Sequence, residues 1–371
     1  MRLLDRYLLR ELLIPLGYCL AGFLIFWVSF DLFSELEDFQ AHKLRGGDVA
    51  QYYLVKSPEF LVIVLPIALL LALLYALTNH ARHHELTAIR ATGVSLWRLS
   101  VPYFGVGLVA SAALFALNEL CVPNSAGMAE HVLNSRSAAK TNSVNQWQTK
   151  LAFQNTRDGR SWLLDYNPET REMRNVHVDW LLADGSRRVL AAVSGARSNG
   201  MWVFFDVQEH TDVPGNILPV NRRSTNVLAM PDFSETPEQI KSEIKISNRF
   251  NTRLTKKPDL PLAEIFNYLR LHGTLSGTNA SWLYTKLHGR LAAPWTCLVV
   301  VLIALPFGAA SDRRNAFVGV ACSILICFVY FVLLQFGLAL GAGGYLPPWF
   351  AAWFPNLSFG IAGLWLTSRV R

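Results

Sequence analysis

The chain has 371 residues, of which 52% are hydrophobic and only 16% are charged, and its formal net charge is +7. This composition is too apolar for an ordinary soluble protein and too polar for a bundle of membrane helices alone, so we expect both kinds of structure. The arginines gather near the ends of apolar segments, which favours membrane orientation over nucleic-acid binding. The cysteine spacing fits neither a disulfide framework nor a metal site.

The first third of the sequence predicts an interfacial helix followed by three membrane spans. Leucines and arginines occupy different faces of residues 1–11, as in an amphipathic helix at a membrane surface. Residues 12–117 then contain three apolar segments. One of these, residues 60–78, carries no charge over a length that suits a bilayer core. A polar, basic stretch, residues 80–99, separates the second segment from the third, and we call it the handle.

The residue pattern of the handle predicts a short amphipathic helix that a partner protein could bind. Its apolar residues recur at steps of three and four, so they share one helical face, and Gly93 should interrupt the helix. The polar side carries Arg82, Glu85 and Arg90. The alternative interpretation is an ordinary cytoplasmic loop anchored by arginine and tryptophan.

Residues 118–287 lack apolar spans and predict an all-β domain. Asp-Gly, Asn-Pro and Asn-Gly pairs, which form turns, separate short alternating segments at residues 146–153, 161–166, 176–182, 188–197 and 201–208. Strands at this spacing suggest an antiparallel sandwich or a jelly roll, followed by a helical linker. Trp180, Trp202 and Phe204 lie on these strands and are candidates for a slot that holds an acyl chain, and simple core packing is the alternative.

Residues 288–371 predict three more spans, so the fold class is an α-helical membrane protein with six spans and an inserted all-β, jelly-roll-like domain. Short segments on one side of the spans carry ten Lys and Arg residues, and those on the other side carry three. We therefore predict that both termini and the handle are cytoplasmic and that the β domain lies outside the membrane.

Two spans offer surfaces to a lipid that must enter from the side. Large aromatic side chains line the first span and two glycines end the fifth: Phe26, Trp27, Phe30, Phe33, Gly337 and Gly341. A GxxxG pair permits close packing against a neighbouring helix. Lys43 and Arg45 follow the first span and could hold lipid phosphates.

No catalytic constellation stands out in the sequence. A phosphate-binding GxxxxGK[ST] loop is absent. His80, His83, His84 and Glu85 cluster in the handle without the HExxH order, so we predict no metal site and no cofactor. Ionisable residues are scarce within the spans, which counts against proton- or sodium-driven transport.

The segment ELTAIRATGVSLWRL, residues 85–99, resembles the signature of the lipopolysaccharide-export permeases, the YjgP/YjgQ family. Supporting motifs occur in the family's order, namely LDRYLLRELL, LHGRLAAP, LPFG and LPPWFAAWFPN. Their order, together with a β domain between spans three and four, makes the resemblance specific. LDRY near the start and LPP near the end favour the G-type over the F-type permease.

The resemblance implies a non-catalytic permease that extracts lipopolysaccharide from the outer leaflet of a bacterial inner membrane. It passes the lipid to a periplasmic β-jelly-roll bridge towards the outer membrane. The implied partners are a cytoplasmic ABC ATPase dimer, a paralogous second permease, a single-span periplasmic jelly-roll protein and the bridge protein. The resemblance assigns the ATPase contact to Glu85. An acidic run precedes Lys43 and Arg45, where family members often have basic residues.

Two other functions fit parts of the sequence. One is a permease of another envelope-lipid or lipoprotein-releasing ABC system, although that family usually places its external domain after the first span. The other is a membrane-anchored enzyme acting on envelope lipids, which would need convergent catalytic groups at the outer surface.

Overall fold

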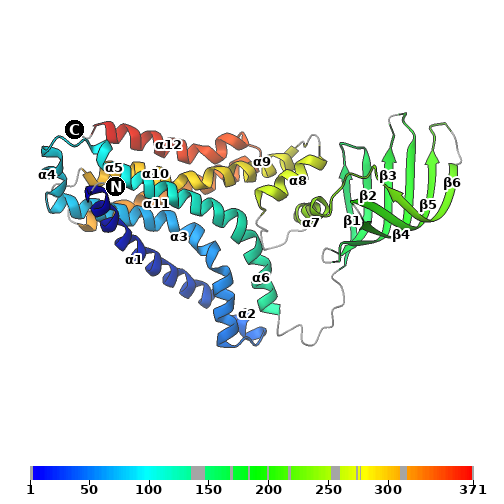
Figure 1. The fold of residues 1–371 in the computed structure, drawn as a ribbon, viewed down its shortest axis with the longest axis horizontal. Helices are drawn as coiled ribbons and strands as arrows, with labels where there is room; N and C mark the ends of the chain where they lie inside the picture. The colour runs from blue at the N-terminus through cyan, green and yellow to red at the C-terminus, as the bar shows by residue number, and fades with distance from the viewer. Residues whose placement is uncertain are drawn as a thin grey trace. The chain divides into compact units, whose positions relative to one another are not determined.

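The computed structural model describes residues 3–134, 147–167, 170–182, 184–198, 200–215, 219–251, 260–272, 275, 277–309 and 316–369. The chain divides into two compact units, which we call the helical unit (Met1–Ala138 with Gly277–Arg371) and the sheet unit (Ala139–Ser276). Figure 1 shows long helices in the first and one curved sheet with short helices in the second.

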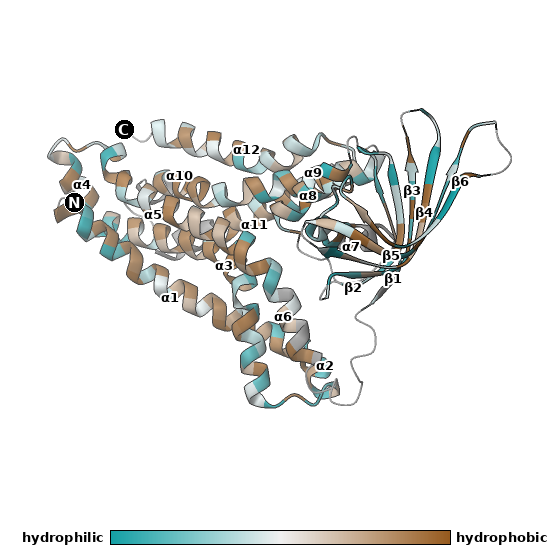
Figure 2. Cartoon of the chain, turned by 45° about the vertical axis from the view of Figure 1, so that its right-hand side comes forward, coloured by the Kyte–Doolittle hydropathy of each residue, from teal (hydrophilic) through white to brown (hydrophobic). Residues whose placement is uncertain are grey.

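The helical unit is built from α1 (Leu3–Ser34), α2 (Leu36–Ala41), α3 (Gly46–Arg82), α4 (Glu85–Ala91), α5 (Leu96–Ala116), a π-helical turn (Leu117–Cys121), α6 (Val122–Asn134), α9 (Gly277–Ala292), a 3₁₀ turn (Ala293–Trp295), α10 (Thr296–Ala309), α11 (Ala316–Ala342) and α12 (Pro348–Arg369). Figure 2 shows that apolar residues dominate the long helices, whereas the strands mix apolar and polar residues.

Five helical segments within the described residues are long and apolar enough to cross a membrane: Leu3–Ser34, Gly46–Arg82, Leu96–Ala129, Gly277–Pro306 and Ile324–Ala342. The prediction of a helical membrane protein is therefore confirmed. The predicted sixth span forms α12, which is not among these five. Its prolines and tryptophans, together with Asn356, lower its mean hydropathy, so a count of six spans stays a prediction.

The predicted interfacial helix over residues 1–11 does not form a separate element. It is the first part of α1, which continues through Pro15. Leu8, Leu12 and Leu16 form one buried stripe. This stripe joins the same core as the buried leucines of α3, so packing holds α1 together across the proline.

Helix α3 is the centre of the helical unit and packs against α1, α5, α10 and α11. It is apolar on all sides over most of its length, as expected of a helix that neighbours surround. Leu69, Leu73 and Leu77 are fully buried, and they share a core with Tyr103 of α5 and Val301 of α10.

The sheet unit contains the strands β1 (Gln148–Asn155), β2 (Arg160–Asn167), β3 (Glu172–Leu181), β4 (Arg187–Ser198), β5 (Met201–Asp212) and β6 (Val220–Met230), followed by α7 (Pro237–Asn251) and α8 (Leu262–Leu271). The strands pair antiparallel in sequential order, β1 to β6, as a meander. The inserted all-β domain is thus confirmed.

The described strands do not have the topology of a jelly roll. A jelly roll has two sheets with Greek-key connections, whereas these strands form one sheet in which each strand pairs with its sequence neighbours. Short turns between successive strands favour this arrangement because they allow antiparallel neighbours to pair directly. A helix and a loop, rather than a second sheet, complete the core: Phe233, Ile240 and Ile244 pack against the buried face of the strands.

The sheet unit is narrower than the predicted domain of residues 118–287. At its start, the helix that begins as α5 runs on through a π-helical turn into α6, which ends at Asn134. At its end, α9 begins at Gly277 and belongs to the helical unit. Sequence polarity alone therefore placed both boundaries inside helices.

Candidate functional site

The helix of the handle is shorter than the predicted residues 80–99. Helix α4 covers only Glu85–Ala91, whereas residues 80–82 end α3 and residues 96–99 begin α5 (Figure 1). His84 before α4 and Gly93 after it both have positive φ angles, 58° and 84°, so the backbone turns sharply on each side of the helix. Ser95 then caps α5, because its hydroxyl accepts a hydrogen bond from the Arg98 backbone N–H at 3.3 Å. The predicted interruption at Gly93 is confirmed.

The apolar face of α4 joins the core of the helical unit, since Leu86 is buried and Ile89 packs against the same cluster. Arg82 is exposed and Arg90 is half-buried. Arg82 therefore presents its charge at the surface, and Arg90 does so in part.

Glu85 is held by side chains from two other helices. Its Oε2 atom accepts a hydrogen bond from Tyr7 Oη of α1 at 3.0 Å and lies 2.7 Å from His80 Nδ1 of α3. A second link joins Arg98 Nη2 of α5 to Asp5 Oδ2 of α1 at 3.2 Å. The amino-terminal end of α1 is thus fastened to both ends of the handle. We call these two links the α1 clamp.

The carboxylate of Glu85 is charged and partly accessible. Burial raises its pKa, but the hydrogen bonds with His80 and Tyr7 and the charge interactions with His80 and His83 together outweigh burial, so the pKa lies below its usual value. Its side chain is 33% exposed, whereas that of His80 is only 2% exposed. An ionised carboxylate at this surface can accept a charge-assisted hydrogen bond from a cation of a partner.

The predicted lipid-facing aromatics lie on the exposed side of α1. Phe26, Phe30 and Phe33 are 64%, 65% and 78% exposed, and Trp27 is half-buried. The three phenylalanines follow one another at steps of four and three residues, so they form one stripe along the helix. We call these three residues the phenylalanine stripe.

The predicted glycine pair of α11 is buried within the chain. A Cβ atom at Gly337 would lie 2.6 Å from the carbonyl oxygen of Ala351, and one at Gly341 would lie 2.6 Å from the Ala351 Cβ atom. The glycines therefore let α11 approach α12 of the same chain, which is the close helix packing that a GxxxG pair permits, and their part in a lateral gate stays a prediction. The exposed face of α11 carries large residues instead, including Phe328 and Phe336.

Lys43 and Arg45 are exposed in the turn between α2 and α3. A third cation near this end of α1, Lys56, has its Nζ atom 3.0 Å from Asp31 Oδ2, and both side chains are largely buried. The charge of Lys56 is thus neutralised within the chain, whereas Lys43 and Arg45 present theirs at the surface.

Two of the three predicted acyl-slot residues fill the core of the sheet unit. Trp202 and Phe204 have no exposed surface. Trp202 Nε1 donates a hydrogen bond to the Glu235 backbone oxygen at 2.7 Å, and the ring of Phe204 lies 5.8 Å from that of Phe233. Trp180 is half-buried and remains accessible at the rim.

The sequence analysis did not predict a polar network that lies inside the helical unit. Tyr330 Oη lies 2.7 Å from Thr296 Oγ1 and donates a hydrogen bond to Asn356 Oδ1 at 2.8 Å. Asn356 Nδ2 in turn donates to the Ala292 backbone oxygen at 2.8 Å. This network joins α9, α10, α11 and α12. Isolated polar residues in apolar segments give no sequence signal for such pairing.

The described part of the chain contains no group of three or more His, Cys, Asp or Glu side chains placed to hold a metal ion. His80 and Glu85 are within hydrogen-bonding distance of each other, and their contact joins α3 to α4.

A comparison with curated proteins finds no significant match. A family model, in contrast, covers nearly the whole sequence, including the handle, the inserted sheet and the closing helices. That model describes the lipopolysaccharide export system permease LptF/LptG and matches residues 6–369, so the chain belongs to this family of non-catalytic, multi-pass inner-membrane transport subunits.

Proposed function

We propose that the handle couples this lipopolysaccharide-export permease to a cytoplasmic ABC ATPase dimer, with Glu85 as the docking carboxylate. Arg82 and Arg90 supply basic contacts beside it, and Gly93 sets where the helix ends. The α1 clamp is the observation that carries the proposal. Because α1 is tied to the handle by side chains, a movement imposed on α4 is transmitted to α1 as well as to α3 and α5.

We further propose that the chain works with a paralogous second permease, of which it is the G-type partner. The single-span periplasmic jelly-roll protein and the bridge protein then receive the lipid. Purification of the tagged chain from its native membrane, followed by mass spectrometry, tests this assembly. Recovery of the ATPase and a second, related permease is the expected result. A chain that purifies with neither contradicts the proposed assembly.

The proposed topology has six spans, both termini and the handle inside, and the sheet unit in the periplasm. In a background with Cys121 replaced by serine, a cysteine at Ser198 should react with a membrane-impermeant maleimide in intact spheroplasts. A cysteine at Arg82 should react only after permeabilisation, because the basic segments favour the cytoplasmic side. Labelling with the opposite pattern would invert the topology.

We assign the lateral entry of the lipid to the phenylalanine stripe of α1 and the exposed face of the partner permease's corresponding fifth span. A lipid with several acyl chains must enter sideways, and the stripe is exposed along the outer half of α1. Lys43 and Arg45, exposed after α1, are assigned the contacts with lipid phosphates.

A disulfide between a cysteine at Phe30 and one in the outer half of that partner span should stop lipopolysaccharide release, and reductant should restore it. The matched control is a cysteine at Ile14, an exposed residue in the inner half of α1, paired with the inner half of the same span. This control should leave release largely intact. Continued release by the complex crosslinked at Phe30 would mean that the lipid enters elsewhere.

For the acyl slot, we propose Trp180 as the accessible residue at the rim. A photoreactive amino acid at Trp180 should capture lipopolysaccharide when ATP is hydrolysed. The same substitution at Leu181, the next residue along β3, tests the face of the strand, because successive side chains point to opposite faces. Equal capture at both positions, or none at Trp180 in a transporting complex, would remove Trp180 from the lipid path.

A further inference from the structure

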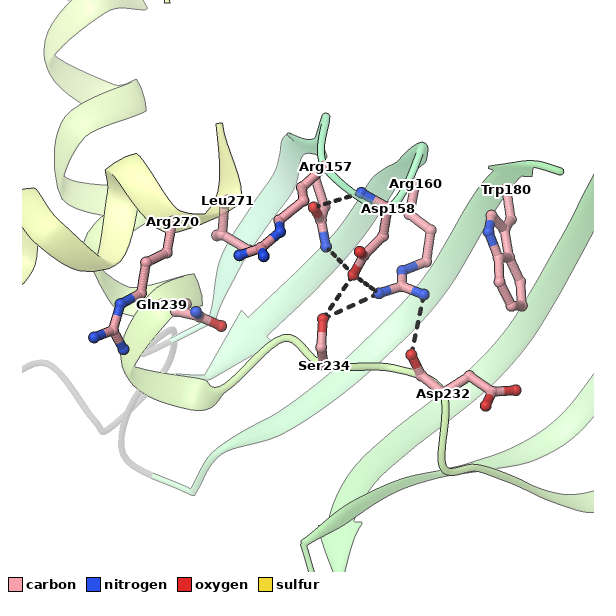
Figure 3. A pocket seen from close by; sticks show the side chains of 10 residues that line it. Arg157, Asp158, Arg160, Trp180, Asp232, Ser234, Gln239, Arg270 and Leu271 are labelled. Carbon is pink, nitrogen blue, oxygen red and sulfur yellow. Dashed lines mark hydrogen bonds and ion pairs between the residues drawn. The ribbon is translucent and has the colours of Figure 1, made fainter. Parts of the chain in front are cut away.

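The sheet unit contains a cleft of about 750 Å³ whose lining is rich in arginine. It is formed by the turn between β1 and β2, by β2 and β3, by the loop after β6, and by α7 and α8 (Figure 3). We call it the arginine cleft, after Arg157, Arg160 and Arg270. Its volume lies within the range of ~300–1,000 Å³ that is usual for small-molecule sites.

Arg160 forms the rigid floor of the cleft. Its side chain is 2% exposed, and its Nε atom donates to Glu235 Oε1 at 2.8 Å. Its other nitrogens donate to the Asp232 backbone oxygen, to Ser234 Oγ and to the Asp158 carboxylate. These bonds occupy the guanidinium of Arg160, so its role in the cleft is to fix the surrounding backbone.

The guanidinium groups of the other two arginines are not occupied by such hydrogen bonds. Arg157 and Arg270 are exposed, and in Figure 3 the guanidinium of Arg157 extends towards Arg270 and the Gln239 amide. Within the described ranges, neither arginine makes an ion pair or a hydrogen bond with another side chain. The nearby Asp158 already accepts hydrogen bonds from Asn155, Arg160 and Ser234.

Two guanidinium groups and an amide at one end of a cleft suit an anion with several oxygens. Arginine binds phosphate and carboxylate through paired N–H···O bonds, which a planar guanidinium presents in a fixed geometry. The remainder of the cleft suits a polyhydroxylated ring. The exposed carboxylate of Asp232 can accept hydrogen bonds from the hydroxyl groups of such a ring.

We propose that the arginine cleft binds an acidic sugar, with its phosphate or carboxylate on Arg157 and Arg270 and its hydroxyl groups beside Asp232. The inference extends the family's function, because it assigns part of the sheet unit to the hydrophilic portion of the glycolipid. An acyl chain does not suit this end of the cleft, since it would cover two guanidinium groups without pairing them.

The test uses the full chain in detergent micelles and glucose 1-phosphate as the probe, with binding followed by saturation-transfer NMR. Each of Arg157→Gln and Arg270→Gln should weaken binding about tenfold, and the double variant should lose saturable binding. Arg157→Lys should retain part of it, because the charge remains. The matched control is Arg187→Gln, which removes an exposed arginine from β4 of the same unit, and its affinity should equal that of the wild type.

Two comparisons separate the sources of binding. Glucose alone and inorganic phosphate alone should both bind more weakly than glucose 1-phosphate. The proposal would be overturned if the double variant bound glucose 1-phosphate as tightly as the wild type does. It would also be overturned if the wild type bound inorganic phosphate as tightly as glucose 1-phosphate. ATP-driven lipopolysaccharide release is measured in parallel on the assembled complex. If release proceeds while the wild-type chain binds no sugar phosphate, the inference fails and the transport function stands.

Discussion

Replacing Glu85 with alanine is expected to reduce coupled ATP hydrolysis and lipopolysaccharide release by roughly tenfold to a hundredfold. The carboxylate is ionised and a third of its side chain is exposed, so a cation of the ATPase can bind it directly. A hydrogen bond to a charged group contributes ~1.5–3 kcal/mol, which sets the size of the loss. The assay is ATP hydrolysis and lipid release by the purified complex in liposomes.

Two variants distinguish docking from a general loss of charge or of the clamp. Glu37→Ala removes an exposed carboxylate from α2 and should leave both rates unchanged. Tyr7→Phe removes one of the two side chains that hold Glu85 Oε2, while His80 remains, so the loss should be smaller than for Glu85→Ala. Equal losses for Tyr7→Phe and Glu85→Ala would mean that Glu85 acts through its contact with α1. Normal coupling in Glu85→Ala would contradict its assignment as the docking residue.

Replacing Arg160 with methionine is expected to destabilise the sheet unit by about 3–5 kcal/mol, since breaking a buried ion pair leaves an unpaired charge. Arg160 is 2% exposed and its partner Glu235 is fully buried. Asn155 and Trp162 would still donate to Glu235 Oε1, but neither neutralises the carboxylate. Near-ultraviolet circular dichroism of the full chain, to which the buried Trp162 and Trp202 of this unit contribute, should show a thermal transition at lower temperature.

The control for this prediction is Arg188→Met, which breaks the more exposed ion pair with Glu209 on neighbouring strands. That change should cost less than about 1 kcal/mol, because water screens a partly exposed pair. Adding Glu235→Gln to Arg160→Met should recover part of the lost stability, since the amide oxygen still accepts hydrogen bonds without a buried charge. The prediction is wrong if Arg160→Met and Arg188→Met melt at the same temperature.

The family match also decides between the functions that the sequence left open. It covers residues 6–369, so the helices, the handle and the inserted sheet belong to one lipopolysaccharide-export permease. A lipoprotein-releasing permease and a membrane-anchored enzyme therefore no longer explain the chain. The choice between the two paralogous permeases stays a prediction.

Local patterns in the sequence determined the elements of this protein. Apolar length predicted six spans, five of which correspond to described helices long and apolar enough to cross a membrane, and the step of three and four residues identified α4. Alternation with turn pairs located the first five strands, because a half-buried strand shows its period of two directly. The sequence analysis did not predict strand β6 or helix α7. Strand β6 lies mostly exposed and lacks a clear apolar alternation.

Only the tertiary structure decided which elements meet. Tyr7 and Glu85 are 78 residues apart, and nothing in either segment specifies the other. The glycines of α11 could pack against any helix, and they pack against Ala351 of α12. The six strands could have divided between two sheets, but they form one. Local sequence fixes backbone conformation through periodicity and turn chemistry, whereas long-range contacts depend on how all the apolar faces are buried together.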